Sequence, residues 1–174
     1  MSTSATAARA TLTERRLVMV MVDLAGFSKA IAPLSSMQLA ELVDAFYRLM
    51  ADAIESHGGR VIKFVGDGCL AVFGEADAVA AVGCVGDVVE PIRALGRAHG
   101  VALDVGANIH LSVVVEGPLG GRANDIIGAG VLHVFRMGAG PGIRLSEPVY
   151  RKLPNDQRSG WAKHQAPATY TLHP

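Results

Sequence analysis

Residues 61–74, VIKFVGDGCLAVFG, constrain the fold more than any other segment of this chain. Two short apolar runs flank Gly66-Asp67-Gly68, and a glycine beside an aspartate is typical of the tight turn between antiparallel strands. The predicted hairpin carries two charges, Lys63 and Asp67, and an unpaired charge is costly to bury. We therefore expect both side chains to be paired, to bind a ligand or to lie in water.

The segments around this hairpin alternate between strand and helix patterns. Residues 15–23, RRLVMVMVD, are typical of a strand buried on both faces. Apolar residues at three- and four-residue spacing predict a helix over 35–57, and an alanine- and valine-rich helix follows over about 76–99. With a further strand over 101–115, the order is β-α-β-β-α-β. This order predicts a ferredoxin-like core.

The remaining segments predict a C-terminal α/β extension of that core. A glycine-rich loop is expected at 117–125, a third helix from about Gly128 to Met137, a short strand and helix within 142–153, and a last strand at 168–173. The predicted fold class is α+β, an antiparallel sheet flanked by helices. We expect one domain over residues 14–174 and a disordered segment over 1–13.

Composition excludes several classes of protein. The chain of 174 residues is 50% hydrophobic and 18% charged with a formal net charge of zero, which argues against nucleic acid and anionic membranes as partners. Cys69 and Cys84 lack metal-ligand spacing and are expected to be buried free thiols. Residues 1–13 contain no apolar run long enough for a signal peptide or a membrane span. These features predict a soluble, cytoplasmic protein.

Two aspartates are candidates for a metal–phosphate site. Asp23 ends an apolar strand, and the small residues of DLAGFS after it could present backbone N–H groups to phosphate. Taken alone, Asp23 could equally be a helix cap and Asp67 an ordinary turn residue. In a β-α-β-β unit, however, the end of the first strand and the hairpin turn can lie side by side. Two carboxylates there could bind two divalent ions about 4 Å apart.

Several dispersed motifs resemble the catalytic domain of class III nucleotidyl cyclases. The first half matches through Asp23, Gly26-Phe27-Ser28, Gly58-Gly59, Lys63 and Gly66-Asp67, in that order. The second half continues through DIIGAGVLHVFRM (125–137) and PGIRLSEPVYRKL (141–153). The resemblance covers roughly residues 15–172, and the ordered set is far more specific than any one motif.

The resemblance implies roles for the matching residues. Asp23 and Asp67, helped by the carbonyl of Leu24, would hold two Mg²⁺ or Mn²⁺ ions. The β- and γ-phosphates would lie against Ala25, Gly26, Phe27 and Ser28. Lys63 and Asp125 would bind the base, and a lysine donor with a carboxylate acceptor suits adenine. Arg136 would stabilise charge on the transferred phosphoryl group.

The implied enzyme is an adenylate cyclase, a phosphorus–oxygen lyase that converts ATP to 3′,5′-cyclic AMP and pyrophosphate. The ribose 3′-oxygen attacks the α-phosphate, and positioning and charge stabilisation supply most of the catalysis. In this family the active sites form at a dimer interface, with the metal aspartates from one subunit and the arginine from the other. The chain contains both sets of residues, so we expect a homodimer, controlled by expression, by dimerisation or by a separate regulatory partner.

One position departs from the family pattern. An asparagine normally precedes the arginine by four residues, but Leu132 stands there and cannot bond to a ribose oxygen. The loss of one such donor costs about 100- to 1,000-fold in rate, which implies a slow enzyme. Alternatives are an inactive nucleotide-binding or dimerising regulatory module, or a cyclase for GTP or a pyrimidine nucleotide. His133 lies about 100° round a helix from Leu132 and is expected on a surface or interface.

Three further polar residues carry weaker predictions. Lys163 and His164 could approach the triphosphate, although a solvated surface is the simpler expectation for them. His110, in the fourth predicted strand, is expected in the core or at an interface.

Overall fold

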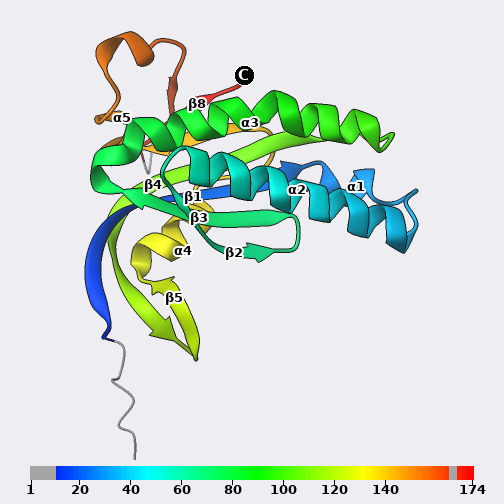
Figure 1. Cartoon of the computed structure of the whole chain (residues 1–174). Helices are drawn as coiled ribbons and strands as arrows, with labels where there is room; N and C mark the ends of the chain where they lie inside the picture. The colour runs from blue at the N-terminus through cyan, green and yellow to red at the C-terminus, as the bar shows by residue number, and fades with distance from the viewer. Residues whose placement is uncertain (1–10, 165–167) are drawn as a thin grey trace, which may run out of the picture.

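The computed structural model describes residues 11–164 and 168–174, which form an eight-stranded sheet with helices on both faces (Figure 1). The strands run in the order β2-β3-β1-β4-β6-β8-β7, and β5 pairs beside β4. Their bounds are β1 Thr13–Ala25, β2 Arg60–Val65, β3 Gly68–Gly74, β4 Asp104–Leu119, β5 Arg122–Ile127, β6 Gly142–Ser146, β7 Ala162–His164 and β8 Thr169–Leu172.

Strand β1 is an interior strand of the sheet, and both of its faces are apolar. Val18, Val20 and Val22 face one core and Met19 faces the other, and all four are at most 1% exposed. The strand pairs antiparallel with β3 on one side and with β4 on the other. A near-continuous apolar run is the pattern expected of such a doubly covered strand.

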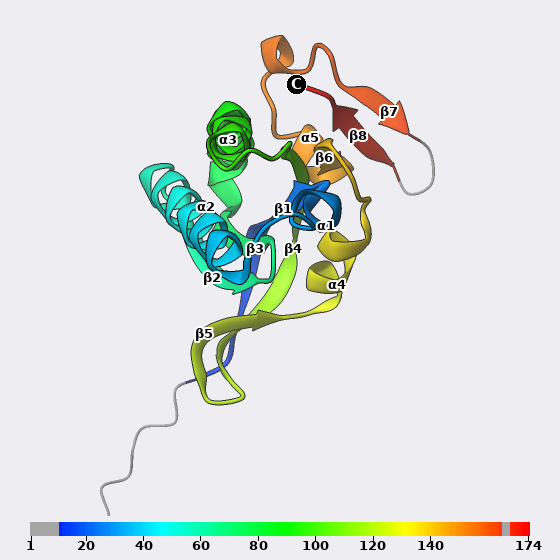
Figure 2. The same cartoon turned by 90° about the vertical axis from the view of Figure 1, so that its right-hand side faces the viewer.

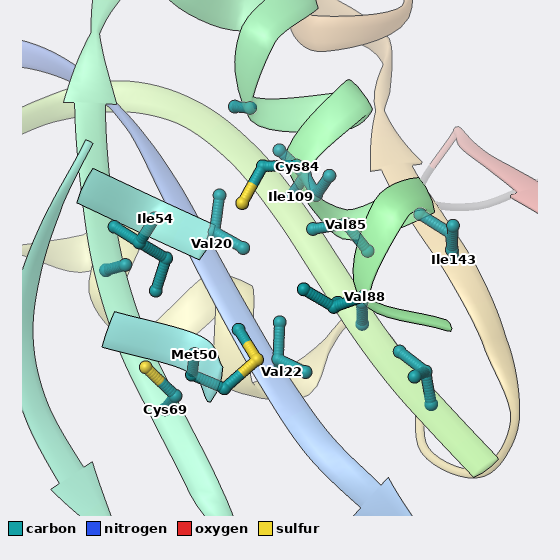
Figure 3. Packing of buried hydrophobic residues seen from close by; sticks show 14 of the residues in the cluster. Val20, Val22, Met50, Ile54, Cys69, Cys84, Val85, Val88, Ile109 and Ile143 are labelled. Carbon is teal, nitrogen blue, oxygen red and sulfur yellow. The ribbon is translucent and has the colours of Figure 1, made fainter. Parts of the chain in front are cut away.

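Helices α2 (Ser36–Ser56) and α3 (Ala78–Ala98) cover one face of the sheet and contact each other (Figure 2). Helix α2 begins with a capping box between Ser35 and Gln38. Figure 3 shows the core beneath these helices, where Cys69 and Cys84 lie among valine, isoleucine and methionine side chains. Burial raises the pKa of the Cys69 thiol to about 12 and that of Cys84 to about 11. Both are free and buried, as predicted.

Helix α4 (Ala129–Arg136) packs on the opposite face of the sheet (Figure 2). It covers a smaller core that includes Met19, Val114 and Val134. Two short helices complete the set: α1 (Phe27–Ala30) follows β1, and α5 (Glu147–Tyr150) follows β6. None of the helices in the described ranges is long and apolar enough to cross a membrane.

The predicted ferredoxin-like α+β core is confirmed, since the strands of the β1-α2-β2-β3-α3-β4 unit lie in the order β2-β3-β1-β4. The sheet is not wholly antiparallel, because the connection through α4 brings β6 parallel to β4. Residues 117–125, predicted as a loop, instead form most of a hairpin between β4 and β5, with Gly120 and Gly121 at its turn. Gly120 and Gly121 have φ of 59° and 78°, the turn geometry that glycine allows.

The chain termini also differ from the prediction. Strand β1 begins at Thr13, inside the segment expected to be disordered, because this end of β1 pairs with β4 at Glu116. Residues 1–10 of that segment lie outside the described residues. Strand β7, which was not predicted, pairs with β8.

Candidate active site

The end of β1 meets the turn between β2 and β3. Asp23 pairs with Gly68 across the β1–β3 ladder, and the backbone N–H of Leu24 donates to the carbonyl of Asp67 at 3.2 Å. The antiparallel register therefore brings two carboxylates, 44 residues apart in the sequence, to one place. This juxtaposition depends on the strand order of the core and on a turn of only two residues, Gly66 and Asp67.

Asp23 and Asp67 line one pocket of about 350 Å³. Residues Leu24 to Lys29 also line it, and so does Gly140 from the loop after α4. The structure thus places the residues predicted for metal and phosphate binding around a single cavity. Lys63, Asp125 and Arg136 are not among the residues that line it.

The Asp23 carboxylate lacks a protein partner for one of its oxygens. Its Oδ1 is buried and accepts no hydrogen bond from the described residues. Burial raises the pKa of Asp23, the nearby charge of Asp67 raises it further, and the Arg144 guanidinium opposes both. Gly106 makes room for the carboxylate, because a Cβ atom at that position would collide with Oδ1.

This environment suits a divalent cation. A buried, unpartnered carboxylate oxygen beside a second carboxylate is stabilised by positive charge, and Mg²⁺ and Mn²⁺ prefer oxygen ligands. Within residues 11–164 and 168–174, no group of three or more His, Cys, Asp or Glu side chains is placed to hold a metal. An ion at Asp23 and Asp67 would therefore complete its shell with backbone carbonyls, water or substrate phosphate.

Helix α2 holds the turn that carries Asp67. The Tyr47 hydroxyl donates to the carbonyl of Gly66 at 2.6 Å, and the Tyr47 ring stacks on Phe64 with centroids 4.1 Å apart. Gly66 has a φ of 60°, a conformation that most residues adopt only with strain. The position of Asp67 is thus set from two sides, by the β1 backbone and by Tyr47.

The DLAGFS segment turns sharply where β1 ends. Gly26 adopts a φ of 86° and caps the one-turn helix α1, whose first residues are Phe27 and Ser28. The backbone N–H groups of Phe27 and Ser28 donate no hydrogen bond within the described part of the chain. These N–H groups are therefore free to bind an anion at the rim of the Asp23 pocket.

Lys63 and Asp125 form an ion pair between β2 and β5. The Lys63 Nζ lies 2.7 Å from Asp125 Oδ2, and the lysine and aspartate side chains are 30% and 14% exposed. Partial burial acts to raise the pKa of Asp125, but hydrogen bonds from Lys63 and from the Ile126 N–H outweigh it and lower the pKa. The two residues predicted to bind the base are therefore already in contact.

Helix α4 presents the other predicted residues. Arg136 is exposed at its last turn, and none of the described residues forms an ion pair or hydrogen bond with its side chain. Leu132 and Phe135 are 59% and 44% exposed on the same helix. His133 packs its ring against His110 of β4, with ring centroids 4.5 Å apart. His133 is held by His110, beneath α4, and does not share the outward position of Leu132.

Lys163 and His164 lie far across the sheet from Lys63. They belong to β7, at the opposite edge from β2, and Lys163 approaches the face of the Tyr170 ring at 5.8 Å. Both side chains are exposed, which agrees with the simpler expectation of a solvated surface.

Sequence reasoning missed four residues that shape these sites: Tyr47, Gly106, Gly140 and Arg144. Arg144 donates to four carbonyls of the loop 139–142, at 2.6 Å to 3.3 Å, and so holds Gly140 at the pocket. A glycine inside a strand often marks a close approach, and this signal could have identified Gly106. No sequence pattern marks Tyr47 or Arg144, because both side chains donate to backbone carbonyls, which every residue has.

Comparison with known proteins finds partial sequence similarity to two bacterial proteins. No family model matches the chain. It is 34% identical over 71 residues to an adenylate cyclase of Streptomyces coelicolor, which covers 41% of this chain and 19% of that protein. An uncharacterized protein of Mycobacterium tuberculosis is 34% identical over 61 residues, or 35% of this chain and 11% of its own. The chain thus spans less than a fifth of these relatives.

Solved structures are similar over nearly the whole chain. The guanylyl cyclase Cya2 superposes with a TM-score of 0.79 at 24% identity, covering 91% of both chains. The adenylyl cyclase CyaB from P. aeruginosa gives 0.80 at 21% identity, covering 94% of this chain and 97% of that one. The guanylyl cyclase domain of the RhoGC fusion protein from Blastocladiella emersonii is similar both as a monomer and as a non-canonical dimer, with TM-scores of 0.77 and 0.78 at 18% identity. The resemblance to the class III cyclase catalytic domain is confirmed at the level of the fold.

Proposed function

We propose that this chain, which has the fold of a nucleotidyl cyclase catalytic domain, converts ATP to 3′,5′-cyclic AMP and pyrophosphate. The observation that carries the proposal is the pocket where Asp23 and Asp67 meet, with a buried carboxylate oxygen that lacks a protein partner. A cation and a triphosphate are the groups that this pocket would accept. The similarity to an adenylate cyclase of Streptomyces coelicolor supports the reaction class.

Asp23, Asp67 and the carbonyl of Leu24 would hold Mg²⁺ or Mn²⁺, and the N–H groups of residues 25–28 would bind the β- and γ-phosphates. Bound metal would neutralise the triphosphate and acidify the ribose 3′-hydroxyl. The 3′-oxygen then attacks the α-phosphorus, and pyrophosphate leaves. Arg136, exposed at the end of α4, would stabilise the charge that develops on the phosphoryl oxygens.

The base would bind at the Lys63–Asp125 pair. The lysine Nζ can donate to N1 of adenine, and the carboxylate can accept from the 6-amino group. Guanine presents a donor and an acceptor at the corresponding atoms, so the same pair would meet it with two mismatches. This chemistry favours ATP over GTP, and hydrogen-bonding sites discriminate strongly against such mismatches.

The placement of these groups supports a homodimer as the active form. The Asp23 pocket lacks Lys63, Asp125 and Arg136, so one copy would supply the metal residues and its partner the base-binding residues and the arginine. Exposed apolar side chains on adjacent strands could form the contact: Val113 of β4 and Ile127 of β5 are 52% and 58% exposed. A monomer is expected to be nearly inactive.

Turnover of all four nucleoside triphosphates by the purified protein, with Mn²⁺, tests this proposal. We expect cyclic AMP and pyrophosphate from ATP, and rates that rise with protein concentration as dimers form. An Asp67→Asn variant should lose this activity and keep its fold. A protein that binds metal and ATP without any turnover would instead be a nucleotide-binding module, the alternative that Leu132 favours.

Substitution of Leu132 separates a slow enzyme from an inactive one. Leu132→Asn places an amide where a ribose ligand is expected, and we predict a rate gain of up to about 100-fold in kcat. Because Leu132 is 59% exposed, the change should hardly alter stability. Phe135→Asn, the same type of change three residues along the same helix, serves as the control. No gain in either variant would contradict the role assigned to position 132.

A further inference from the structure

Strands β2 and β5 contact each other through side chains, although neither pairs with the other in the sheet. Two cationic residues of β2 bridge the gap. Arg60 donates through Nη1 to the carbonyl of Asn124 at 3.1 Å, and Lys63 donates to the carboxylate of Asp125 at 2.7 Å. Two adjacent residues of β5 are thus held from the same neighbouring strand.

Asn124 has an unusual backbone conformation. Its φ of 59° makes it the one non-glycine residue with positive φ in the described part of the chain. It lies where the β4–β5 ladder is irregular, because Gly117 pairs with Asp125 but Leu119 pairs with Arg122. A left-handed residue at this point changes the path of the backbone, and with it the direction in which the side chain of the next residue, Asp125, points.

Arg60 is itself held in place by Glu116 of β4. The Arg60 Nη2 forms a close ion pair with Glu116 Oε1, and Glu116 Oε2 lies 3.1 Å from Arg15 Nε of β1. The Glu116 side chain is only 19% exposed, so the interaction is partly shielded from water. The Arg60 guanidinium therefore bonds both to the Asn124 carbonyl and to the Glu116 carboxylate, which also pairs with Arg15 of β1.

We propose that Arg60 is a positioning residue for base recognition. By holding the left-handed Asn124, it sets the carboxylate of Asp125 relative to Lys63 and so determines how well the pair distinguishes adenine from guanine. The inference rests on the proposed role of Lys63 and Asp125 in binding the base. Arg60 touches neither the base nor the phosphates in this scheme.

The test compares Arg60→Met with Arg60→Lys and with Arg97→Met. Methionine keeps the apolar stem but loses both hydrogen bonds, and lysine keeps the charge without the fork. Arg97 pairs with Glu90 on the exposed surface of α3 and is the matched control. For each protein, kcat/KM and the equilibrium dissociation constant are measured with ATP and with GTP, in Mn²⁺.

We expect Arg60→Met to reduce the preference for ATP over GTP by at least about tenfold, with a smaller reduction in Arg60→Lys and none in Arg97→Met. If Arg60 only joins β2 to β5, its substitution should weaken the binding and turnover of ATP and GTP equally. An unchanged ATP-to-GTP ratio in Arg60→Met would therefore overturn the inference while leaving the proposed reaction intact. If the native protein turns over no nucleotide, the proposed reaction fails, and the ratio of dissociation constants still decides the role of Arg60. Absence of any nucleotide binding would overturn both.

Discussion

Two carboxylates in this molecule, Asp23 and Asp125, are similar in chemistry but opposite in environment. Asp23 is partly buried beside Asp67 with one oxygen unpartnered, and its pKa is raised. Asp125 is bonded to Lys63 and to the Ile126 N–H, and its pKa is lowered. The protein alone stabilises the charge of Asp125, whereas it leaves the charge of Asp23 poorly compensated.

The difference shows what each part of the site still requires. At Asp23 burial and the charge of Asp67 disfavour the ionised form, which a bound cation would stabilise. At Asp125 the cation is already present as Lys63, and a ligand would exchange its own donors and acceptors for this ion pair. In the proposed site, a ligand would therefore have to complete the half at Asp23 and Asp67, whereas the Lys63–Asp125 pair of the other half is already formed.

The largest effect is expected from Asp23→Asn. Asparagine has the same shape without the charge, so turnover should fall by at least about 100-fold when a cation can no longer be held. The free energy of unfolding in metal-free buffer at pH 7 should rise, because the raised pKa means that ionised Asp23 opposes folding above pH 4. Chemical denaturation and initial rates measure the two effects.

Asp44→Asn is the matched control for that substitution, since Asp44 lies in an exposed ion pair with Arg48 on α2. It should leave turnover unchanged and alter stability by less than about 1 kcal/mol. If Asp23→Asn instead lowers the stability of the metal-free protein, the environment of Asp23 is already satisfied and the comparison with Asp125 fails.

Asp125→Asn should have the opposite effect on stability. The change leaves Lys63 unpaired in a partly buried position and should cost about 1 kcal/mol at pH 7. The lowered pKa of Asp125 means that its contribution exists above the unfolded pKa near 3.9 and disappears as pH falls through the folded pKa. The stability difference between native protein and variant should therefore shrink in acid, as measured by denaturation at several pH values.

The Asp125→Asn variant should weaken ATP binding and reduce the ratio of kcat/KM for ATP to that for GTP about tenfold. Asp87→Asn, at an exposed position that faces His57, controls for loss of a surface charge. Equal stability curves for Asp125→Asn and the native protein would show that the Lys63–Asp125 pair is not preformed in solution.

The environments of these aspartates were only partly predictable from the sequence. The β-α-β-β order and the Gly66-Asp67 turn predict that Asp23 and Asp67 are neighbours, because register and turn length are local properties. The contact between Lys63 and Asp125 depends on strand β5, whose residues 122–125 belong to the segment 117–125 that the glycine-rich sequence suggested was a loop. Their meeting could be expected only from the family resemblance.

The residues that hold the site were harder to predict. Tyr47, Arg60 and Arg144 each bond to a backbone carbonyl, at residues 66, 124 and 139–142, and such an acceptor has no counterpart in the side-chain pattern. For Tyr47 and Arg60, the packing of two segments distant in the sequence decides these contacts, whereas the fold of the loop 139–142 decides that of Arg144. A sequence motif therefore identifies groups that bind the ligand more readily than groups that position them.

A smaller effect is expected from His110, which lies in β4 beneath helix α4. Burial and the neighbouring His133 lower the pKa of His110 from 6.5 to about 4. The unfolded chain therefore takes up a proton below pH 6.5 while the folded chain does not, and stability falls as pH decreases from 6.5 to 4. After allowance for solvent screening, we expect His110→Gln to remove about 1–2 kcal/mol of this loss.

The groups that face His110 are His133 from α4, Met19 across the β1–β4 ladder, and Asn108 and Ser112 on the same face of β4. None of them offers a negative charge, so protonation of His110 is not compensated. His99→Gln, at the end of α3, is the control. If His110→Gln and the native protein lose the same stability between pH 6.5 and 4, other groups cause this pH dependence.

The smallest effect is expected from Tyr47→Phe. The change removes one hydrogen bond to the Gly66 carbonyl but keeps the stacking on Phe64, so the cost in stability is about 1 kcal/mol. Because this bond fixes the turn that carries Asp67, the Mn²⁺ concentration for half-maximal turnover should rise a fewfold, whereas the ATP-to-GTP ratio should not change. A shift in that ratio would mean that the metal half and the base half of the site are coupled through the β2–β3 hairpin. Equal ratios in Tyr47→Phe and native protein, with a weaker metal dependence, would establish that the two halves are set independently.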